Sequence, residues 1–272
     1  MPQPNSTIKY LLLILLSLFM SCSEKPASGK QVLVTEGFSK RVLDAYWLYL
    51  PKHYTEDKKW PMIMYLQGGD AAASSYPNTV KEGGPVYYLL NQQKAILPDS
   101  FIIVNPHMKP GTMEDRQWYK NTEALIQIID QTILQNNADP DRIYLTGLSR
   151  GGHGSWGVAK RYPEKFAAIV PIAGAITCNS NCEKMEDLAI WIAHNDKDPV
   201  VDYEYPQKAV NYFETELGRP FVRIAGVNDR NIMESNSIFT TFDSDSHGGA
   251  DGKLYRSPSL YHWLLSKRKN LK

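Results

Sequence analysis

The stretch Gly147-Leu148-Ser149-Arg150-Gly151 decides how this chain folds, because it matches Gly-x-Ser-x-Gly between a strand-like and a helix-like run. The run before it, Arg142–Thr146, is β-branched and aromatic, which predicts a buried strand. The run after it, Gly152–Tyr162, can start a helix. A serine at such a turn is typical of a nucleophile elbow, in which a Cβ at either flanking glycine would crowd a neighbour. The alternative is an ordinary serine in a glycine-rich turn.

Apolar runs alternate with helical patterns along the chain, which indicates an α/β fold with a central, mostly parallel sheet and helices on both faces. We expect Asn105-Pro106 to stop a strand, Asp139-Pro140-Asp141 to form a turn, and residues 225–238 to form a hairpin. No internal repeat is present, so one domain is expected over residues 31–272. The expected strands are 42–50, 61–66, 101–104, 142–146, 166–172, 188–193, 221–224 and 239–242, and the expected helices are 118–135, 152–162, 205–217 and 258–265.

The composition suits one globular domain with a well-buried core, since 43% of the 272 residues are hydrophobic. The formal net charge is +1, and no basic stripe with interleaved aromatics is present, which argues against a nucleic-acid partner. No histidine cluster has zinc-ligand spacing and no nucleotide-binding glycine fingerprint appears, so neither a metal nor another cofactor is expected.

The first 22 residues resemble a signal peptide that ends in a lipobox. Lys9 precedes an apolar run from Tyr10 to Met20, which is too short to span a bilayer comfortably. Ser21 then precedes Cys22, the residue that would carry the lipid. The alternative is a plain signal peptide with an incidental cysteine. We expect an exported bacterial lipoprotein, anchored in a membrane and facing the periplasm or the cell surface, with a flexible polar tether at 23–30.

Two cysteines remain after Cys22 is set aside. Cys178 and Cys182 are separated by three residues, and in an oxidising compartment they could close a short disulfide loop. The competing interpretation is half of a zinc site, but no second half lies nearby.

A serine nucleophile needs a base within hydrogen-bond reach and a group that orients the base. In α/β-hydrolases the chain order is serine, acid, histidine. Two carboxylates, Asp196 and Asp198, follow the strand expected at 188–193, where open α/β sheets place their sites. His247 lies in a later polar, glycine-rich loop, and it is favoured as the base after elimination of His53, His107, His153 and His262.

The oxyanion formed during acyl transfer needs preorganised donors. One is expected from the backbone N–H of Arg150, and the other from Gly69, with Gly68 as a close alternative. Trp118 and the Arg150 side chain are candidates to line the substrate cleft, and the alternative for them is packing and surface charge.

From Asp141 to Pro171 the sequence resembles the dienelactone-hydrolase and feruloyl-esterase-like branch of the α/β-hydrolases, some of which are labelled predicted peptidases or phospholipase/carboxylesterases. The most specific part is Thr146–Gly152, and the likeness extends over about residues 38–268. The resemblance implies a catalytic triad of Ser149, Asp198 and His247, because the family's acid segment aligns with 194–201 and places the acid on Asp198 rather than Asp196. It also supports Gly69 as an oxyanion donor.

The chain departs from the family pattern at three places. Gln67 replaces a histidine before the oxyanion loop, Asn195 replaces a glycine, and Gly248–Ala250 stands where a tryptophan follows the catalytic histidine. These departures bear on the substrate and on the shape of the pocket more than on the triad.

The sequence is compatible with three functions. The first is a serine esterase acting on small-molecule or polysaccharide esters, such as feruloyl or acetyl esters. The second is a serine peptidase that uses the same triad, because acyl-transfer machinery does not separate esters from amides. The third is a non-catalytic, carbohydrate-binding surface lipoprotein, against which the ordered Ser149, Asp198 and His247 argue.

Overall fold

The computed structural model describes residues 27–39, 42–69, 83–91, 100–112, 114–178, 181–227 and 232–269. The predicted signal peptide, with Cys22, lies outside these residues. Of the predicted tether at 23–30, residues 27–30 are described, and they form a turn in which the Gly29 N–H donates to the Leu50 carbonyl (2.9 Å).

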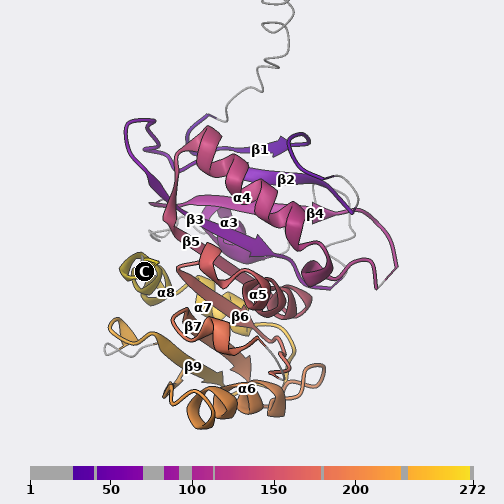
Figure 1. Cartoon of the computed structure of the whole chain (residues 1–272), viewed down its shortest axis with the longest axis vertical. Helices are drawn as coiled ribbons and strands as arrows, with labels where there is room; N and C mark the ends of the chain where they lie inside the picture. The colour runs from indigo at the N-terminus through magenta and orange to yellow at the C-terminus, as the bar shows by residue number, and fades with distance from the viewer. Residues whose placement is uncertain are drawn as a thin grey trace, which may run out of the picture.

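A nine-stranded sheet forms the centre of the described part of the chain, in the order β1-β2-β4-β3-β5-β6-β7-β9-β8 (Figure 1). All pairings from β4 to β8 are parallel, whereas β1–β2 and β2–β4 are antiparallel. The predicted mostly parallel sheet is therefore confirmed. The strands are β1 (Gln31–Val34), β2 (Leu43–Tyr49), β3 (Trp60–Leu66), β4 (Ile102–Met108), β5 (Ala138–Leu148), β6 (Ala168–Ile172), β7 (Ala189–Asn195), β8 (Val222–Ala225) and β9 (Ser237–Phe242).

Helices cover both faces of the sheet, which confirms the predicted α/β architecture. Alternate side chains of β3 enter different cores: Met64 packs in the core that holds residues of α4, α5 and α6, and Tyr65 packs in the core that holds residues of α3, α7 and α8. In Figure 1, α4 and α5 lie in front of the sheet and α3 lies behind it. The helices are α3 (Gly84–Asn91), α4 (Thr122–Asn136), α5 (Arg150–Arg161), α6 (Glu204–Thr215), α7 (Ala250–Tyr255) and α8 (Pro258–Ser266), with 3₁₀ turns at Trp118–Lys120, Pro163–Lys165 and Glu183–Met185.

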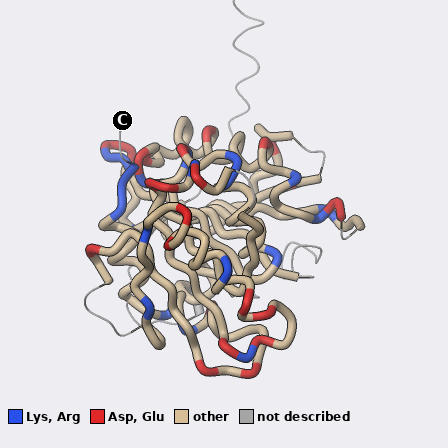
Figure 2. The backbone as a smooth tube through the Cα atoms, turned by 60° about the horizontal axis from the view of Figure 1, so that its bottom comes forward, with Lys and Arg blue, Asp and Glu red and all other residues tan. Residues whose placement is uncertain are grey.

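Basic and acidic residues are interspersed along the described part of the chain. In the view of Figure 2, basic and acidic segments alternate along the backbone, and several acidic segments gather on the loops at the bottom of the picture. This distribution agrees with the formal net charge of +1.

The structure corrects one predicted strand end. The strand expected to stop at Asn105-Pro106 continues as β4 to Met108. Pro106 pairs with β2 at Tyr46, beyond Val104, the last residue of β4 that pairs with β3. The missing N–H of proline is tolerated there because β4 has one neighbouring strand at that point instead of two.

Two predicted turns also differ from the structure. Asp139-Pro140-Asp141 is a bulge within β5 rather than a turn, because Trp60 pairs with Ala138 and Met62 already pairs with Ile143. The hairpin expected at 225–238 is wrong, because β8 and β9 run in parallel. A parallel neighbour requires the chain to cross back to the other end of the sheet before the second strand begins.

Candidate active site

Ser149 lies in the turn between β5 and α5 with φ 55° and ψ −114°, a conformation that L-residues rarely adopt. Its N–H donates to the Ile172 carbonyl (2.9 Å), which ties the turn to β6. A Cβ on Gly151 would lie 1.8 Å from the Leu66 carbonyl oxygen, and a Cβ on Gly147 would lie 2.5 Å from the same atom. The flanking glycines are therefore a steric requirement of the turn.

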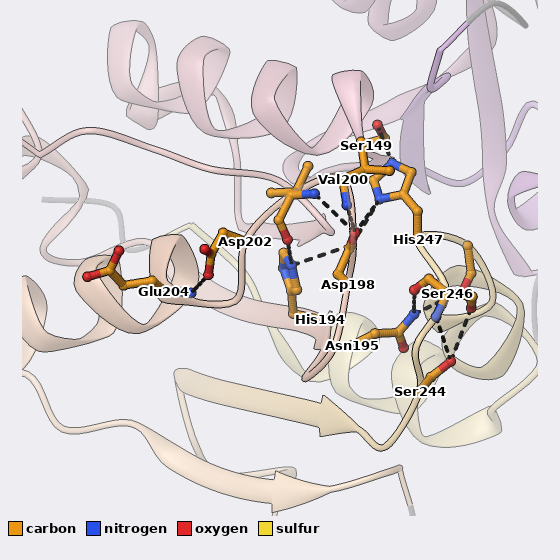
Figure 3. Close-up of polar contacts among 12 residues, drawn as sticks. Ser149, His194, Asn195, Asp198, Val200, Asp202, Glu204, Ser244, Ser246 and His247 are labelled. Atoms are coloured by element: carbon orange, nitrogen blue, oxygen red, sulfur yellow. Dashed lines mark hydrogen bonds and ion pairs between the residues drawn. The ribbon is translucent and has the colours of Figure 1, made fainter.

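The His247 ring lies between Ser149 and Asp198 (Figure 3). Its Nδ1 is 2.9 and 3.0 Å from the two Asp198 carboxylate oxygens, and its Nε2 is 2.7 Å from Ser149 Oγ. A carboxylate only accepts hydrogen bonds, so Nδ1 carries the proton and donates it to Asp198. Nε2 is then left to accept from the Ser149 hydroxyl, which is the arrangement that general-base catalysis requires.

Asp198 is held as a buried carboxylate. Its side chain is 0% exposed, and its Oδ1 accepts the N–H groups of Val200 (2.8 Å) and Val201 (3.0 Å). Burial opposes the charge, but the two backbone donors and His247 outweigh it and hold the Asp198 pKa below its ordinary value. The carboxylate therefore stays ionised and orients the imidazole.

His194 supports the loop that carries Asp198. Its ring is fully buried, and its Nε2–H donates to the Val201 carbonyl (2.8 Å) while lying 3.5 Å from Asp198 Oδ2. Burial lowers the His194 pKa, so the ring is neutral. His194 thus fixes the chain around the acid without adding a positive charge.

The described contacts of Asp196, the other candidate acid, include no hydrogen bond to the His247 ring. Asp196 accepts the Ser244 N–H through Oδ1 (3.1 Å), and the Lys197 N–H donates to the Ser244 carbonyl (3.2 Å). These bonds join the loop after β7 to the loop after β9. The two loops are neighbours because β7 and β9 pair side by side as far as Asn195 and Phe242.

Of the predicted oxyanion donors, Arg150 and the alternative Gly68 lie next to the nucleophile, and Gly69 contacts the Arg150 side chain. Arg150 is the first residue of α5, so its N–H points out of the amino end of that helix. A Cβ on Gly68 would lie 3.5 Å from Ser149 Cβ, and the Gly69 carbonyl accepts from the Arg150 guanidinium (2.7 Å). Gly69 has φ +30°, and no described atom lies within 4 Å of its Cβ position.

Trp118 does not line a substrate cleft, which corrects that expectation. Its side chain is 0% exposed, and its indole N–H donates to the Gln67 carbonyl (2.9 Å). A Cβ on Gly154 would lie 2.5 Å from Trp118 Cβ, so the tryptophan packs closely on α5. Trp118 therefore supports the loop after β3 through its hydrogen bond to Gln67. Packing was the alternative interpretation of this tryptophan.

Asn195 departs from the family pattern, but the sequence alone assigns it no role in the site. In the structure its buried amide nitrogen contacts the loop that carries His247. One feature of the sequence points to this role: Asn195 stands at the end of a strand, three residues before the acid.

Cys178 and Cys182, which were predicted to pair, form a disulfide with their Cα atoms 5.5 Å apart. Among the described residues, no group of three or more His, Cys, Asp or Glu side chains is arranged to hold a metal ion. In the same part of the chain, every helix is too short or too polar to cross a membrane.

Comparisons with known proteins bear on the family and the fold of this chain. The model of the phospholipase/carboxylesterase family matches residues 64–231. A thermostable esterase of known structure superposes with a TM-score of 0.62 at 23% identity, over 88% of this chain and 63% of that one. The likeness shows the α/β-hydrolase fold, which confirms the fold that the sequence resemblance implied.

Two curated relatives are longer proteins. Dipeptidyl-peptidase 5 of Porphyromonas gingivalis is 26% identical over 247 residues, which cover 83% of this chain and 34% of that protein. A bifunctional acetylxylan esterase/xylanase of Neocallimastix patriciarum is 27% identical over 198 residues, which cover 72% of this chain and 27% of that protein. The chain therefore spans about a third of the length of these relatives.

Proposed function

The chain belongs to the phospholipase/carboxylesterase family, and from this premise we propose that it is a serine-dependent carboxylic-ester hydrolase. One observation carries the proposal. The Ser149 hydroxyl, the His247 imidazole and the Asp198 carboxylate form an unbroken chain of hydrogen bonds of 2.7 to 3.0 Å. This order of hydroxyl, imidazole and carboxylate is the one that acyl transfer needs.

The reaction follows from these positions. Ser149 Oγ attacks the ester carbonyl carbon while its proton passes to His247 Nε2, and Asp198 stabilises the imidazolium. The oxyanion would accept the backbone N–H groups of Arg150 and Gly69. The C–O bond then breaks, and the alcohol leaves with the proton from His247. Water next attacks the acyl-serine with His247 as base, which releases the acid and restores the hydroxyl.

Turnover of p-nitrophenyl acetate by the whole chain tests the proposal directly. Ser149→Ala should lower kcat by about 10⁶-fold, to the level left by binding and oxyanion stabilisation alone. Equal rates for the Ser149→Ala variant and the unaltered chain would refute the proposal. In that case a non-catalytic, carbohydrate-binding role would be favoured.

The proposed substrates are acetyl or feruloyl esters, either small or carried by a polysaccharide. The proposal is supported by the similarity to a protein named as an acetylxylan esterase/xylanase. Release of acetate from acetylated xylan, compared with release of ferulate from methyl ferulate, would rank the two acyl groups. Activity on long-chain glycerides alone would contradict this substrate class.

A peptidase activity at the same triad is the second candidate, favoured by the similarity to dipeptidyl-peptidase 5. The triad attacks esters and amides by the same steps. An ester and its matched dipeptide anilide therefore distinguish the two. A kcat/KM for the anilide above that for the ester would assign the chain as a peptidase.

We also propose that the protein is exported and anchored in a membrane through lipid on Cys22, a proposal supported by the apolar run from Tyr10 to Met20. When the full chain is expressed in bacteria with an alkyne fatty acid, the protein should become labelled at Cys22. Cys22→Ser should abolish the label and release the protein from the membrane fraction, and labelling that survives the change would contradict the anchor.

A further inference from the structure

Asn195 is the last residue of β7, and its side chain is buried beneath the loop that carries His247. Its amide nitrogen donates to the carbonyl oxygens of Ser246 (2.7 Å) and Gly248 (2.9 Å), as Figure 3 shows for Ser246. These are the carbonyls of the residues on either side of His247. We propose that Asn195 is a positioning residue that sets the place of His247 through its backbone, an inference that rests on the proposed function.

The direction of the Asn195 amide is fixed by its partners. An amide nitrogen has two N–H donors, and here each can serve one carbonyl. Rotation of the amide by 180° would set Oδ1 against the two carbonyl oxygens, which cannot donate. In the present orientation Oδ1 accepts no hydrogen bond from the described residues. The polar contacts of this buried group are therefore those it makes with the His247 loop.

Other bonds around His247 act at the ends of the loop or within it. The Ser244 N–H donates to Asp196, and the Gly249 N–H donates to Asp251, the second residue of α7. The Ser246 hydroxyl donates to the Gly248 carbonyl, inside the loop (2.7 Å). Asn195 thus joins the middle of the loop to the sheet.

The same strand therefore positions both partners of Ser149. Asn195 ends β7 and holds His247, and Asp198 follows three residues later and bonds to the His247 ring. Because the backbone of β7 is paired with β6 and β9, the acid and the base share one rigid support. A loop without the two donated bonds would let the imidazole move relative to Ser149 Oγ, which is 2.7 Å away.

The test replaces Asn195 with Ala, which removes both donors, and with Asp, which keeps the shape but presents oxygen to two carbonyls. A misplacement of about 1 Å in catalytic geometry costs on the order of 10²-fold in rate. We expect kcat for p-nitrophenyl acetate to fall by that factor in Asn195→Ala, and at least as far in Asn195→Asp. KM should stay within about threefold of the value for the unaltered chain, because Asn195 contacts the backbone of the His247 loop and acts through His247.

Asn137→Asp is the matched control, because the Asn137 amide also donates to a backbone carbonyl, that of Glu56 (2.6 Å), but before the start of β5. Its kcat should stay within about twofold. All variants are assayed at a temperature where circular dichroism shows them folded, and whichever Asn195 variant folds carries the test. A kcat within about threefold of the unaltered chain would overturn the inference, and so would a loss that appears in KM alone.

Hydrogen exchange separates this inference from the proposed function. If the unaltered chain neither hydrolyses the ester nor reacts with a fluorophosphonate, the proposed function fails. Exchange of the peptide 243–249 then decides whether Asn195 holds the loop. Faster exchange of that peptide in Asn195→Ala, with the peptide 55–61 unchanged, supports the positioning role. Equal exchange in the two proteins overturns it.

Discussion

Ser149 adopts a positive φ that costs of order 1–3 kcal/mol for a non-glycine residue, and its glycine neighbours make the turn sterically possible. Gly151→Ala would place a Cβ 1.8 Å from a backbone oxygen of β3, which cannot move away without displacing the strand. We expect a loss of at least about 3 kcal/mol in unfolding free energy, together with loss of activity.

Gly111→Ala is the control for this change, since its Cβ would meet no described atom closer than 3.8 Å. It should alter the free energy of unfolding by less than about 1 kcal/mol. Urea unfolding of both variants measures the difference. Equal stability of the Gly151→Ala and Gly111→Ala variants would show that the elbow is not packed against β3.

Asp198 and Asp196 are expected to differ in their effect on catalysis. Asp198→Asn should lower kcat by about 10⁴-fold, because Asn can stabilise the wrong tautomer of His247. Asp196→Asn keeps an oxygen that can accept the Ser244 N–H, so its loss should stay within about tenfold. Esterase kinetics of the two variants decide the assignment, and a larger loss for Asp196→Asn would reverse it.

At the scale of secondary-structure elements, Asp139 joins the bulge of β5 to the segment after α8. Its carboxylate accepts from Arg142 (2.7 Å) and from Arg268 (2.8 Å), and its side chain is 7% exposed. Burial opposes the charge, but the Arg142 bond, the Asp141 N–H and the two guanidinium charges lower the Asp139 pKa. This carboxylate therefore fastens the end of the chain to the sheet while it is ionised.

Asp139→Asn should destabilise the fold by about 1–3 kcal/mol at pH 7. A lowered folded pKa gives stability that is present above the unfolded value of about 3.9 and is lost as pH falls through the folded pKa. The difference between the two proteins should therefore shrink from pH 5 toward pH 2. Asp130→Asn, which breaks a half-buried pair with Lys165, should cost less than about 1 kcal/mol.

Urea midpoints for Asp139→Asn and Asp130→Asn across this pH range check the prediction. A stability difference between the unaltered chain and Asp139→Asn that stayed constant from pH 5 to pH 2 would contradict the assigned role of Asp139.

The elements that the sequence predicted well are strands buried on both faces. β3 is a continuous apolar run, and β7 is apolar from Ala189 to Ala193. Parallel strands with helices on both faces of the sheet are typically near-continuous apolar runs. α3 and α7 were not predicted, because α3 begins Gly84-Pro85 and α7 has Gly252 in its middle, a composition typical of loops. Helix propensity did not predict these two helices, because packing against the sheet outweighs it.

The site shows the same division between local and distant information. The elbow around Ser149 is a local motif, and the order of acid and histidine follows from the family resemblance, so both could be predicted. Trp118 and Asn195 could not, because their partners lie 51 to 53 residues away and only the tertiary fold brings them together.

At the scale of the whole molecule, the disulfide between Cys178 and Cys182 closes a very short loop. The entropy of closing such a loop predicts a stabilisation of about 2 kcal/mol. Reduction should therefore lower Tm by about 4–8 °C for a chain of this size and leave esterase activity intact at 25 °C. Calorimetry with and without reductant checks this, and loss of the folded state at 25 °C would contradict it.

Covalent labelling by a fluorophosphonate tests the central claim, that a connected Ser149, His247 and Asp198 make one hydroxyl reactive. Mass spectrometry of the whole folded chain should show one phosphonyl group per molecule, mapped to Ser149, and none in His247→Ala on the same time scale. A chain that stays unlabelled while folded, or one labelled elsewhere, would contradict the claim.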